Sequence, residues 1–411
     1  MRVLRIIPVM NPSSGGPCQG IRNIVPELEK LGIHNEVVCL DDPREEFLKK
    51  DNFSITALGP AKGPWAFNAN LVPWLQENLG RFDVVIIHAL WLYHGYGFMK
   101  ALKLYKKQLA DQGKDIVIPR YFVMPHGMLD PYFQYAPERK IKAIRNWIYW
   151  KLIERKLINN ADGVLFTCMS ELLLARIPFR PYHPRKELNI GYGVQSPPPF
   201  ANSMAESFLE KCPQVKNHSF ILFLSRIHDK KGVDLLINAY LKIHEKSQAD
   251  KNFPPNRQSV PKLVIAGPGL ETEYGKRMQQ LVVNDEKLRD SVLFPGMLSG
   301  DAKWGAFYLS EAFILPSHQE NFGIAVVESL ACGKPVLISN KVNIWQEISD
   351  LNAGIISDDT LEGTIKLLEN YLLTTKEKKI EMGKQARLTY KKKFDVVEMA
   401  QQWVNVISQV I

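Results

Sequence analysis

The chain has 411 residues, of which 45% are hydrophobic and 23% are charged. This balance is typical of a globular protein, and it excludes a disordered chain, a collagen-like repeat and a coiled coil. The length exceeds what one hydrophobic core normally serves, so we expect two domains. Lys and Arg number 52 against 43 acidic residues, and a formal charge of +9 favours phosphates, nucleic acid or an anionic membrane as partners.

Cysteine usage and hydropathy indicate the compartment. The five cysteines are scattered and include no Cys-x-x-Cys pair, which argues for a reducing environment and against a disulfide framework or a zinc site. The apolar run at 3–9 is too short for a signal sequence, and no run reaches the roughly 20 residues of a membrane span. We therefore expect a cytoplasmic protein that is free to associate with the inner face of the cytoplasmic membrane.

In the first half of the chain, continuous apolar runs alternate with helical patterns. A Gly-rich loop at 13–16 follows the first run and precedes a helix that ends near Leu31. Continuous apolar strands are covered on both faces, and their alternation with helices predicts a parallel, doubly wound α/β sheet. The predicted strands are 3–9, 36–40, 83–88, 120–124 and 163–167.

The Gly- and Pro-rich stretch 191–200 interrupts this pattern and predicts an interdomain linker. A second alternating series follows and predicts a second doubly wound domain, whose ligand is expected at the carboxyl ends of the strands. A polar stretch, 247–261, is expected to be a surface loop, and the chain beyond Thr360 is expected to be helical. The predicted strands are 220–224, 262–266, 292–294, 312–316 and 335–338, and the helices are 233–245, 275–283 and 323–331.

The strongest chemical signal is the stretch 312–337, in which a strand leads into a loop with Glu320 and then a helix with Glu328. Free backbone N–H groups at a helix start stabilise an anion, and Gly323 allows a ligand to approach the backbone closely. Glu328 can accept hydrogen bonds from a diol such as a ribose. Two solvated glutamates beside a core helix would explain an isolated pair, but the strand–loop–helix context favours a ligand site. The helix start consists of Asn321, Phe322, Gly323 and Ile324.

A second signal follows the strand at 220–224, where Arg226 and Lys231 precede a helix. Both side chains are expected near the carboxyl end of that strand. Two fixed cations suit a diphosphate, because Arg binds it as a bidentate fork and Lys as a point charge. Taken alone, a solvated basic loop explains the pattern equally well.

Together these motifs resemble retaining glycosyltransferases of family 4, which have the GT-B fold of two Rossmann-like domains facing a cleft. The resemblance spans most of the chain and includes an ordered set of further segments. They are the Gly15-Gly16 loop, FDVVIIHALW at 82–91, PHGMLD at 125–130, ADGVLFTCMSE at 161–171, LVIAGPG at 263–269, VLFPGML at 292–298 and NIWQEI at 343–348. The run around PHGMLD is similar to enzymes of bacterial exopolysaccharide, capsule or lipopolysaccharide assembly.

The resemblance implies an acceptor-binding domain at 1–195 and a nucleotide-sugar donor-binding domain at 196–390. It also implies a terminal helix at about 391–411 that crosses back onto the first domain. Closure of the two domains would exclude water and protect the donor from hydrolysis.

The resemblance also implies roles for individual residues. Arg226 and Lys231 would bind the diphosphate as it leaves, Glu328 the ribose, and Glu320 the donor sugar. His126 corresponds to the family histidine near the anomeric carbon, and its place directly after a strand favours this role over a structural one. The remaining implied donor-binding residues are Gly15 and Gly16 over the phosphates, Asn321, Phe322, Gly323 and Ile324 beside sugar or phosphate, and Met297 and Leu298 beside the base.

These roles predict the chemistry. Cleavage of the sugar–phosphate bond places negative charge on the diphosphate, which the two cations and the helix start would stabilise by preorganised electrostatics. Retention implies front-face attack, although a double displacement through a carboxylate is an alternative for which the motifs offer no second carboxylate. The chain contains no Asp-x-Asp, so we predict a metal-independent enzyme without a bound cofactor. His88 also ends a strand, and it would either line the acceptor site or cap the sheet.

The stretch 137–160 is basic, aromatic and helical in pattern. It lies in the segment 101–200, which holds 16 Lys and Arg against 8 Asp and Glu. Ile141, Ile144, Ile148 and Leu152 form one apolar stripe. The favoured interpretation is that the helix packs within a domain and leaves a solvated basic face. The alternative is a surface for anionic lipid or for a polyprenyl-diphosphate acceptor. RNA-binding motifs are not visible, so nucleic acid is not expected.

The sequence therefore predicts a retaining transfer of a hexose from a nucleotide-diphosphate sugar, with UDP-sugars favoured over GDP-sugars. The expected acceptor is a saccharide or a polyprenyl-diphosphate-linked saccharide in cell-surface polysaccharide synthesis. Two alternatives stay open: a nucleotide-sugar epimerase on the same fold, and a non-catalytic nucleotide-sugar-binding subunit of a polysaccharide assembly complex.

Overall fold

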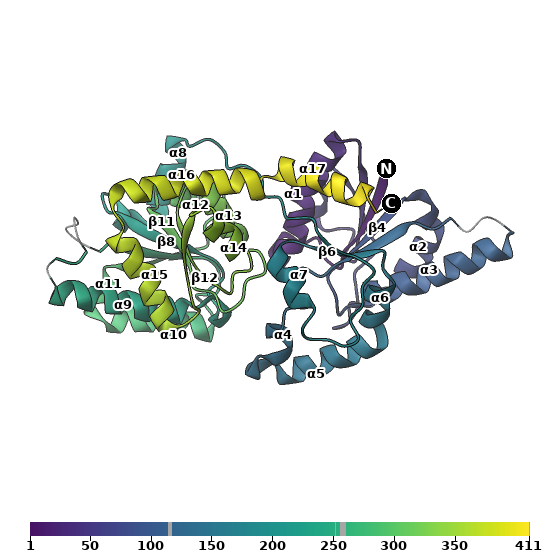
Figure 1. Ribbon diagram of the computed structural model, residues 1–411, viewed down its shortest axis with the longest axis horizontal. Coiled ribbons are helices and arrows are strands. Elements are labelled where there is room, and N and C mark those ends of the chain that lie inside the picture. Colours follow the sequence, from purple (N-terminus) through teal and green to yellow (C-terminus); the bar gives the residue numbers. More distant parts are fainter. Residues whose placement is uncertain (114–116, 251, 255–259, 411) are drawn as a thin grey trace. The chain divides into compact units, whose positions relative to one another are not determined.

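The computed structural model describes residues 1–113, 117–250, 252–254 and 260–410. The chain forms two compact units: Met1–Val194 together with Val396–Ile411, and Gln195–Asp395 (Figure 1). The first of these boundaries lies one residue before the predicted one. The predicted return at about 391 comes too early, because helix α16 (Lys376–Lys393) packs on α13 (Ile324–Ala331) and belongs to the second unit.

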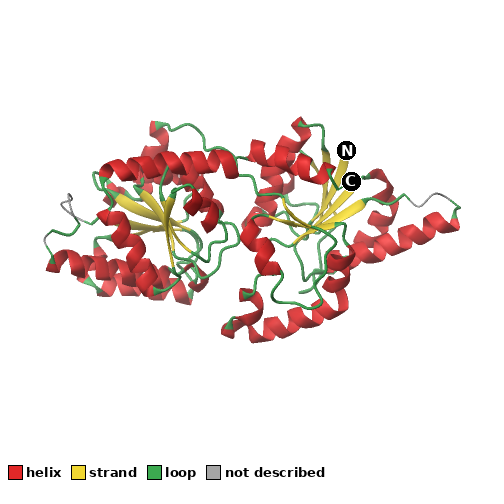
Figure 2. Ribbon diagram, viewed as in Figure 1, coloured by secondary structure: helices red, strands yellow, loops and turns green. Residues whose placement is uncertain are grey.

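The first unit is built on a seven-stranded parallel sheet with helices on both sides, as predicted for a doubly wound domain (Figure 2). The strand order is β3-β2-β1-β4-β5-β6-β7. The strands are β1 (Arg2–Ile6), β2 (His34–Cys39), β3 (Ser54–Ala57), β4 (Val84–His88), β5 (Arg120–Met124), β6 (Gly163–Phe166) and β7 (Glu187–Asn189). The helices are α1 (Gly16–Lys30), α2 (Leu71–Asn78), α3 (Tyr93–Asp111), α4 (Tyr132–Tyr135), α5 (Lys140–Tyr149), α6 (Arg155–Asn160), α7 (Met169–Ala175) and α17 (Val396–Ser408).

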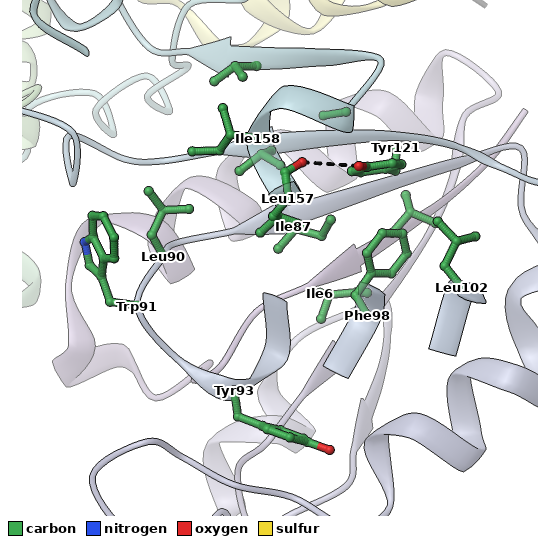
Figure 3. Close-up of a cluster of buried hydrophobic side chains, with 14 of the residues drawn as sticks. Ile6, Ile87, Leu90, Trp91, Tyr93, Phe98, Leu102, Tyr121, Leu157 and Ile158 are labelled. Carbon is green, nitrogen blue, oxygen red and sulfur yellow. Dashed lines mark hydrogen bonds between the residues drawn. The ribbon is translucent and has the colours of Figure 1, made fainter. Parts of the chain in front are cut away.

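Strand β4 shows why its sequence is apolar up to its last residue, His88. All five of its residues are buried, because alternate side chains enter the cores on opposite faces of the sheet. Ile87 joins a cluster in which the Tyr121 hydroxyl donates to the Leu157 carbonyl at 3.2 Å (Figure 3). Ile86 joins the cluster on the other face, which Trp403 of α17 completes. The last helix of the chain is therefore part of the core of the first unit.

The second unit contains a six-stranded parallel sheet in the order β10-β9-β8-β11-β12-β13. Its strands are β8 (Phe220–Leu224), β9 (Lys262–Ala266), β10 (Val292–Gly296), β11 (Ala312–Leu315), β12 (Val336–Ser339) and β13 (Gly354–Ser357). Its helices are α8 (Asn202–Lys211), α9 (Val233–Ala249), α10 (Glu273–Asn284), α11 (Glu286–Arg289), α12 (Gly300–Leu309), α13, α14 (Trp345–Asp350), α15 (Leu361–Leu373) and α16. The two helices α8 and α12, which pack on each other, were not predicted.

The two predicted loops differ from the structure. Within 191–200, the first residues belong to the first unit, where the Val396 N–H donates to the Val194 carbonyl at 3.3 Å. Gly193 allows this contact, since a Cβ there would lie 2.7 Å from the Val396 Cα. In the polar stretch 247–261, helix α9 continues to Ala249, and 251 and 255–259 lie outside the described residues.

The stretch 137–160 is helical and packs within the first unit, as the favoured interpretation expects, but it does not pack through its apolar stripe. It consists of a short 3₁₀ turn, α5, a π-helical turn (Trp150–Glu154) and α6. The apolar stripe does not pack within the unit: Ile141, the most exposed member, is 86% exposed. The helix instead packs through a second face, on which Trp150 is fully buried. Among the described residues, no helix combines the length and the apolar character needed to cross a bilayer.

Candidate functional site

The carboxyl edge of the second sheet is the place to which the sequence motifs converge. The chain order of the strands runs outward in one direction from β8 to β10 and in the other from β11 to β13. In such sheets, ligands bind outside the carboxyl ends of the two strands at which the order reverses. The loops that leave these two strands, β8 and β11, contain Arg226 and Lys231 in one and Glu320 in the other.

Glycines bring the loops at this edge into close contact. Gly232 has a left-handed φ of 67°, and a Cβ at this position would overlap the carbonyl of Pro316 after β11. The loop after β9 is held in the same way, because a Cβ on Gly267 would overlap the carbonyl of Ser225. The Lys230 carbonyl accepts from the N–H of His318 at 2.9 Å. The backbone at this edge is therefore fixed before any ligand arrives.

Lys231 and Glu320 form a direct ion pair between the two loops. The Lys231 side chain is 7% exposed and that of Glu320 is 22% exposed. Burial alone would raise the pKa of Glu320, but the ammonium of Lys231 and the backbone N–H of Phe322 outweigh burial and hold that pKa below its usual value. The motifs assign Lys231 to the diphosphate and Glu320 to the sugar, but in the structure these two residues form one ion pair.

Glu328 also has a cationic partner, which the sequence reasoning missed. Lys303 of α12 donates to Glu328 Oε1 at 2.8 Å, and both side chains are mostly buried. The other oxygen, Oε2, has no hydrogen-bond partner in the part of the chain that the structure describes. The signal that could have identified Lys303 was its place in the sequence. It lies near the start of the helix that follows β10, much as Lys231 lies just before the helix that follows β8.

Arg226 differs from these paired residues. Its side chain is exposed just after β8, and among residues 1–113, 117–250, 252–254 and 260–410 it has no acidic or carbonyl partner. Met297, after β10, is 70% exposed, whereas Leu298 beside it is 5% exposed. Of the two predicted base-binding residues, only Met297 presents its side chain to solvent.

The helix start at 321–324 offers fewer free backbone N–H groups than predicted. Helix α13 begins at Ile324, and Gly323 precedes it with a φ of 79°. The N–H of Phe322 donates to the Glu320 carboxylate, so it is not a free donor. The ring of Phe322 is buried and meets Phe394 edge to face, with the centroids 5.6 Å apart. Its ring is therefore part of the core of the second unit.

The remaining predicted residues lie in the first unit. His126 follows β5 with a φ of 54°, and its Nε2 lies 2.9 Å from Nδ1 of His88 at the end of β4. The second ring nitrogen of His88 lies 3.4 Å from a guanidinium nitrogen of Arg5, which is buried in β1. His88 thus links a buried cation to the predicted catalytic histidine, which resolves neither of the two roles left open for it.

The electrostatics of this cluster keep both histidines neutral. Burial lowers the pKa of Arg5 to about 9, and burial together with the Arg5 charge lowers the pKa of His126 to about 3. Burial, His126 and Arg5 also hold the pKa of His88 well below its usual value. A cavity of about 30 Å³ adjoins the three side chains, and Trp403 forms part of its wall.

A carboxylate that the sequence reasoning did not single out holds the turn that carries His126. Glu171 of α7 accepts from the N–H of Gly127 at 2.5 Å and from the N–H of Thr167 at 2.8 Å. Its signal in the sequence was an acid in the ADGVLFTCMSE segment, close to the start of a helix.

Gly15 and Gly16 also lie in the first unit, at the start of α1. Gly15 has a φ of 90°, and a Cβ on either glycine would meet no atom within 4 Å. The Gly16 carbonyl accepts from the Tyr192 hydroxyl at 2.6 Å. The two glycines therefore form a turn with open space beside it, and the hydrogen bond from Tyr192 holds the turn at Gly16.

Comparison with known proteins follows the two-unit division. A family model described as a glycosyl transferase 4-like domain matches residues 15–181, in the first unit. A second model, described as glycosyl transferases group 1, matches residues 206–389, in the second unit.

Among curated proteins, an uncharacterised glycosyltransferase of Methanocaldococcus jannaschii is 34% identical over 140 residues, which are 34% of this chain and 32% of that protein. The O-antigen chain mannosyltransferase C of Escherichia coli is 24% identical over 198 residues, which are 47% of each chain. The matched segments thus span about a third to a half of these relatives' length.

Among solved structures, the Anabaena protein HepE in complex with UDP and glucose superposes with a TM-score of 0.68 at 17% identity, covering 99% of both chains. At this identity the likeness establishes the fold. The fold and the two family matches, one in each unit, agree: the chain belongs to the family 4 glycosyltransferases of the GT-B fold.

Proposed function

We propose that the protein transfers a hexose from a nucleotide-diphosphate sugar to a saccharide or a lipid-linked saccharide, with retention of configuration. One observation carries the proposal. Arg226 is exposed and has no acidic partner among the described residues, and it stands on the same short loop as Lys231, whose buried ammonium pairs with Glu320 of the neighbouring loop, at the point where the strand order of the sheet reverses. A rigid pair of cations at such a point suits a diphosphate.

The charges define the role of each residue in this proposal. Arg226 binds the diphosphate from the solvent side, and Lys231 supplies a second positive charge that Glu320 already holds in place. Preorganised charges of this kind stabilise a leaving diphosphate without reorganising during the reaction. Glu328, with one oxygen held by Lys303, offers its second oxygen to the ribose hydroxyls.

The bond changes follow from retention. The bond between the anomeric carbon and the phosphate oxygen breaks, and the acceptor oxygen attacks the same face of the sugar. The departing phosphate oxygen takes the proton of the acceptor hydroxyl, so no separate base is required. His126, neutral and held by His88, serves as a hydrogen-bond donor to the donor sugar.

Similar proteins support the finer details of the proposal. HepE was crystallised with UDP and with glucose, which favours a UDP-sugar donor here. The Escherichia coli relative builds an O-antigen chain, which favours a role in cell-surface polysaccharide synthesis in the cytoplasm. Because the chain lacks Asp-x-Asp and has Arg226 and Lys231 at the diphosphate site, we also propose that the transfer requires no metal ion.

Nucleotide binding is the experiment that tests the proposal. Thermal unfolding is measured with UDP, GDP, ADP and CMP for the wild type, for Arg226→Ala and for Arg289→Ala. Arg289 is an exposed arginine of the same unit that precedes β10 at the opposite edge of the sheet, so it serves as the matched control. A ligand that binds the native state raises the unfolding midpoint by mass action.

We expect one nucleoside diphosphate to raise the midpoint of the wild type and the control but not of Arg226→Ala. Transfer activity with the corresponding sugar nucleotide should then persist in the presence of a chelator. No shift with any nucleotide at millimolar concentration would contradict the proposal. Release of free nucleotide from the sugar donor without any acceptor would instead favour an epimerase, and tight binding without turnover would favour a binding subunit.

A further inference from the structure

The solvent-facing side of helix α5 and the π-helical turn carries five exposed large apolar side chains. Their exposed fractions range from 44% for Ile148 to 86% for Ile141. We call this set, together with the cations beside it, the α5 surface. Its apolar members are Ile141, Ile144, Trp147, Ile148 and Leu152, and its cations are Lys140, Lys142, Arg145 and Lys151.

The opposite side of the helix fixes the α5 surface in place. Ala143, Asn146 and Trp150 are buried there, and Trp150 stacks on Phe179 with the ring centroids 4.9 Å apart. At 3.6 residues per turn, these buried positions lie half a turn away from Ile141 and Ile148. The apolar stripe therefore points directly away from the core, and the fold does not need it for packing.

Cations border the stripe along both sides. Successive positions at 100° place Lys140 and Lys151 on one side of it and Lys142 and Arg145 on the other. The run from 139 to 153 contains no acidic residue. For Lys140, Lys142 and Lys151, no acidic partner exists in the described parts of the chain, and Lys151 lies over the Trp147 ring at 5.4 Å.

An exposed apolar stripe between two rows of cations is the pattern of a helix that lies in the plane of a membrane surface. The apolar side chains enter the boundary of the acyl chains, Trp occupies the headgroup level, and the cations meet anionic headgroups. A second copy of the chain fits this surface less well, because two such faces would oppose like charges across the contact.

We propose that the α5 surface docks the first unit in the plane of an anionic lipid bilayer. The helix lies parallel to the membrane, with the stripe inserted and the unit rigidly attached through Trp150. Docking of this kind would bring the first unit to acceptors that carry a lipid, and it is independent of nucleotide binding in the second unit.

Sedimentation with vesicles tests the proposal. The full chain is mixed with vesicles of phosphatidylcholine alone, or of phosphatidylcholine and phosphatidylglycerol in equal parts. Two paired variants probe the surface: Ile144→Ser with Ile148→Ser removes apolar contacts, and Lys142→Glu with Lys151→Glu reverses charge. The matched controls lie in the second unit at exposed positions: Leu281→Ser with Val283→Ser, and Lys391→Glu with Lys392→Glu.

We expect the wild type and both controls to bind the anionic vesicles and not the neutral ones. Each cation near an anionic surface strengthens binding by about fivefold, so the charge variant, which removes two cations, should weaken it by at least about 25-fold. The serine variant should weaken binding by a similar factor, and high salt should release the wild type. The unfolding midpoint and the nucleotide response should stay unchanged in all variants, because the substituted side chains are exposed.

Three results would overturn the proposal. The first is that the wild type does not bind anionic vesicles, and the second is that the serine variant binds them as tightly as the wild type does. Alternatively, the wild type would form a concentration-dependent dimer that the serine variant abolishes while no vesicle binding is seen, which would assign the surface to a second copy. Because nucleotide binding is measured on the same variants, failure of the membrane proposal is distinguished from failure of the transfer proposal.

Discussion

Nδ1 of His88 and Nε2 of His126 lie 2.9 Å apart, and this contact, together with that between His88 and Arg5, determines where the protons of both rings reside. On its other side, His88 faces Arg5, whose guanidinium can only donate. His88 Nε2 must therefore accept, which leaves the proton of the neutral ring on Nδ1. His126 Nε2 accepts that proton, so the proton of His126 itself resides on Nδ1.

Nitrogen-15 NMR of the imidazole side chains tests this assignment. We expect both His88 and His126 to be neutral near pH 7 with the proton on Nδ1. Arg5→Met removes the obligatory donor, which should allow both rings to change tautomer because either nitrogen of His88 can then donate. A wild-type spectrum with the His126 proton on Nε2 would contradict the chain of hydrogen bonds.

Acid should destabilise the first unit above the range in which ordinary carboxylates titrate. Burial lowers the pKa of His126 to about 3 and that of His94 to about 4, whereas an unfolded histidine titrates near its usual 6.5. Below pH 6.5 the unfolded state binds more protons, so the free energy of unfolding falls as pH falls from 6.5 towards 3. The slope should reach about 1.4 kcal/mol per pH unit for each such histidine.

Urea unfolding between pH 7 and about 5 measures this slope. The variant His94→Gln keeps a side-chain N–H for the carbonyl of His88, to which His94 donates at 2.8 Å, but it cannot titrate. In this variant the free energy of unfolding should depend less steeply on pH, by the contribution of one histidine, whereas the exposed control His34→Gln should keep the wild-type slope. A pH-independent wild type over this range would show that the buried histidines accept protons in the folded state.

Removal of Lys231 should cost stability as well as binding. Lys231→Met leaves the mostly buried Glu320 carboxylate without its partner, and we expect a loss of about 3 kcal/mol in the free energy of unfolding. The double variant Lys231→Met with Glu320→Leu removes both charges and should recover most of that stability without recovering nucleotide binding. Equal stability of the single and double variants would show that the pair is not coupled.

The close contact of loops at Gly232 should be sensitive to one methyl group. Gly232→Ala adds a Cβ that overlaps the Pro316 carbonyl, in addition to the strain of a left-handed residue. Gly296 is the matched control, because its φ of 76° is similar but a Cβ there meets no atom within 4 Å. Thermal unfolding should show that Gly232→Ala loses at least about 1 kcal/mol more than Gly296→Ala. Equal losses would mean that strain alone matters at both positions.

Central strands could be predicted from the sequence because burial on both faces demands continuous apolar residues. The strands β5, β8 and β9 occupy the predicted positions. The strands β3, β7 and β13 were missed; they lie at the edges of the sheets, where their side chains are half-buried and need no long apolar run. The fourth edge strand, β10, was predicted because it begins with the apolar run 292–294. A hydrophobic pattern thus reports the burial of a strand rather than its existence.

Which face of helix α5 is buried could not be predicted, for a related reason. Periodicity identifies a face, but the face that packs carries Ala143, Asn146 and Glu154, which look like solvent residues in the sequence. The pairing of Lys231 with Glu320 was also beyond the sequence, because 89 residues separate them and the motifs assign them to different parts of the donor. Arg5 did leave a signal: a lone charge within an otherwise apolar strand.

Helix α17 has a consequence for how the protein is made. The core of the first unit includes Trp403, which is fully buried on the face that also contains Ile86. During synthesis on the ribosome, the whole of the second unit is therefore made before α17, which the first unit needs for its core, becomes available. The second unit is continuous in sequence and has no such delay. The order of completion should thus be the reverse of the usual one for multidomain chains, because the first unit is completed only after the second unit has been made.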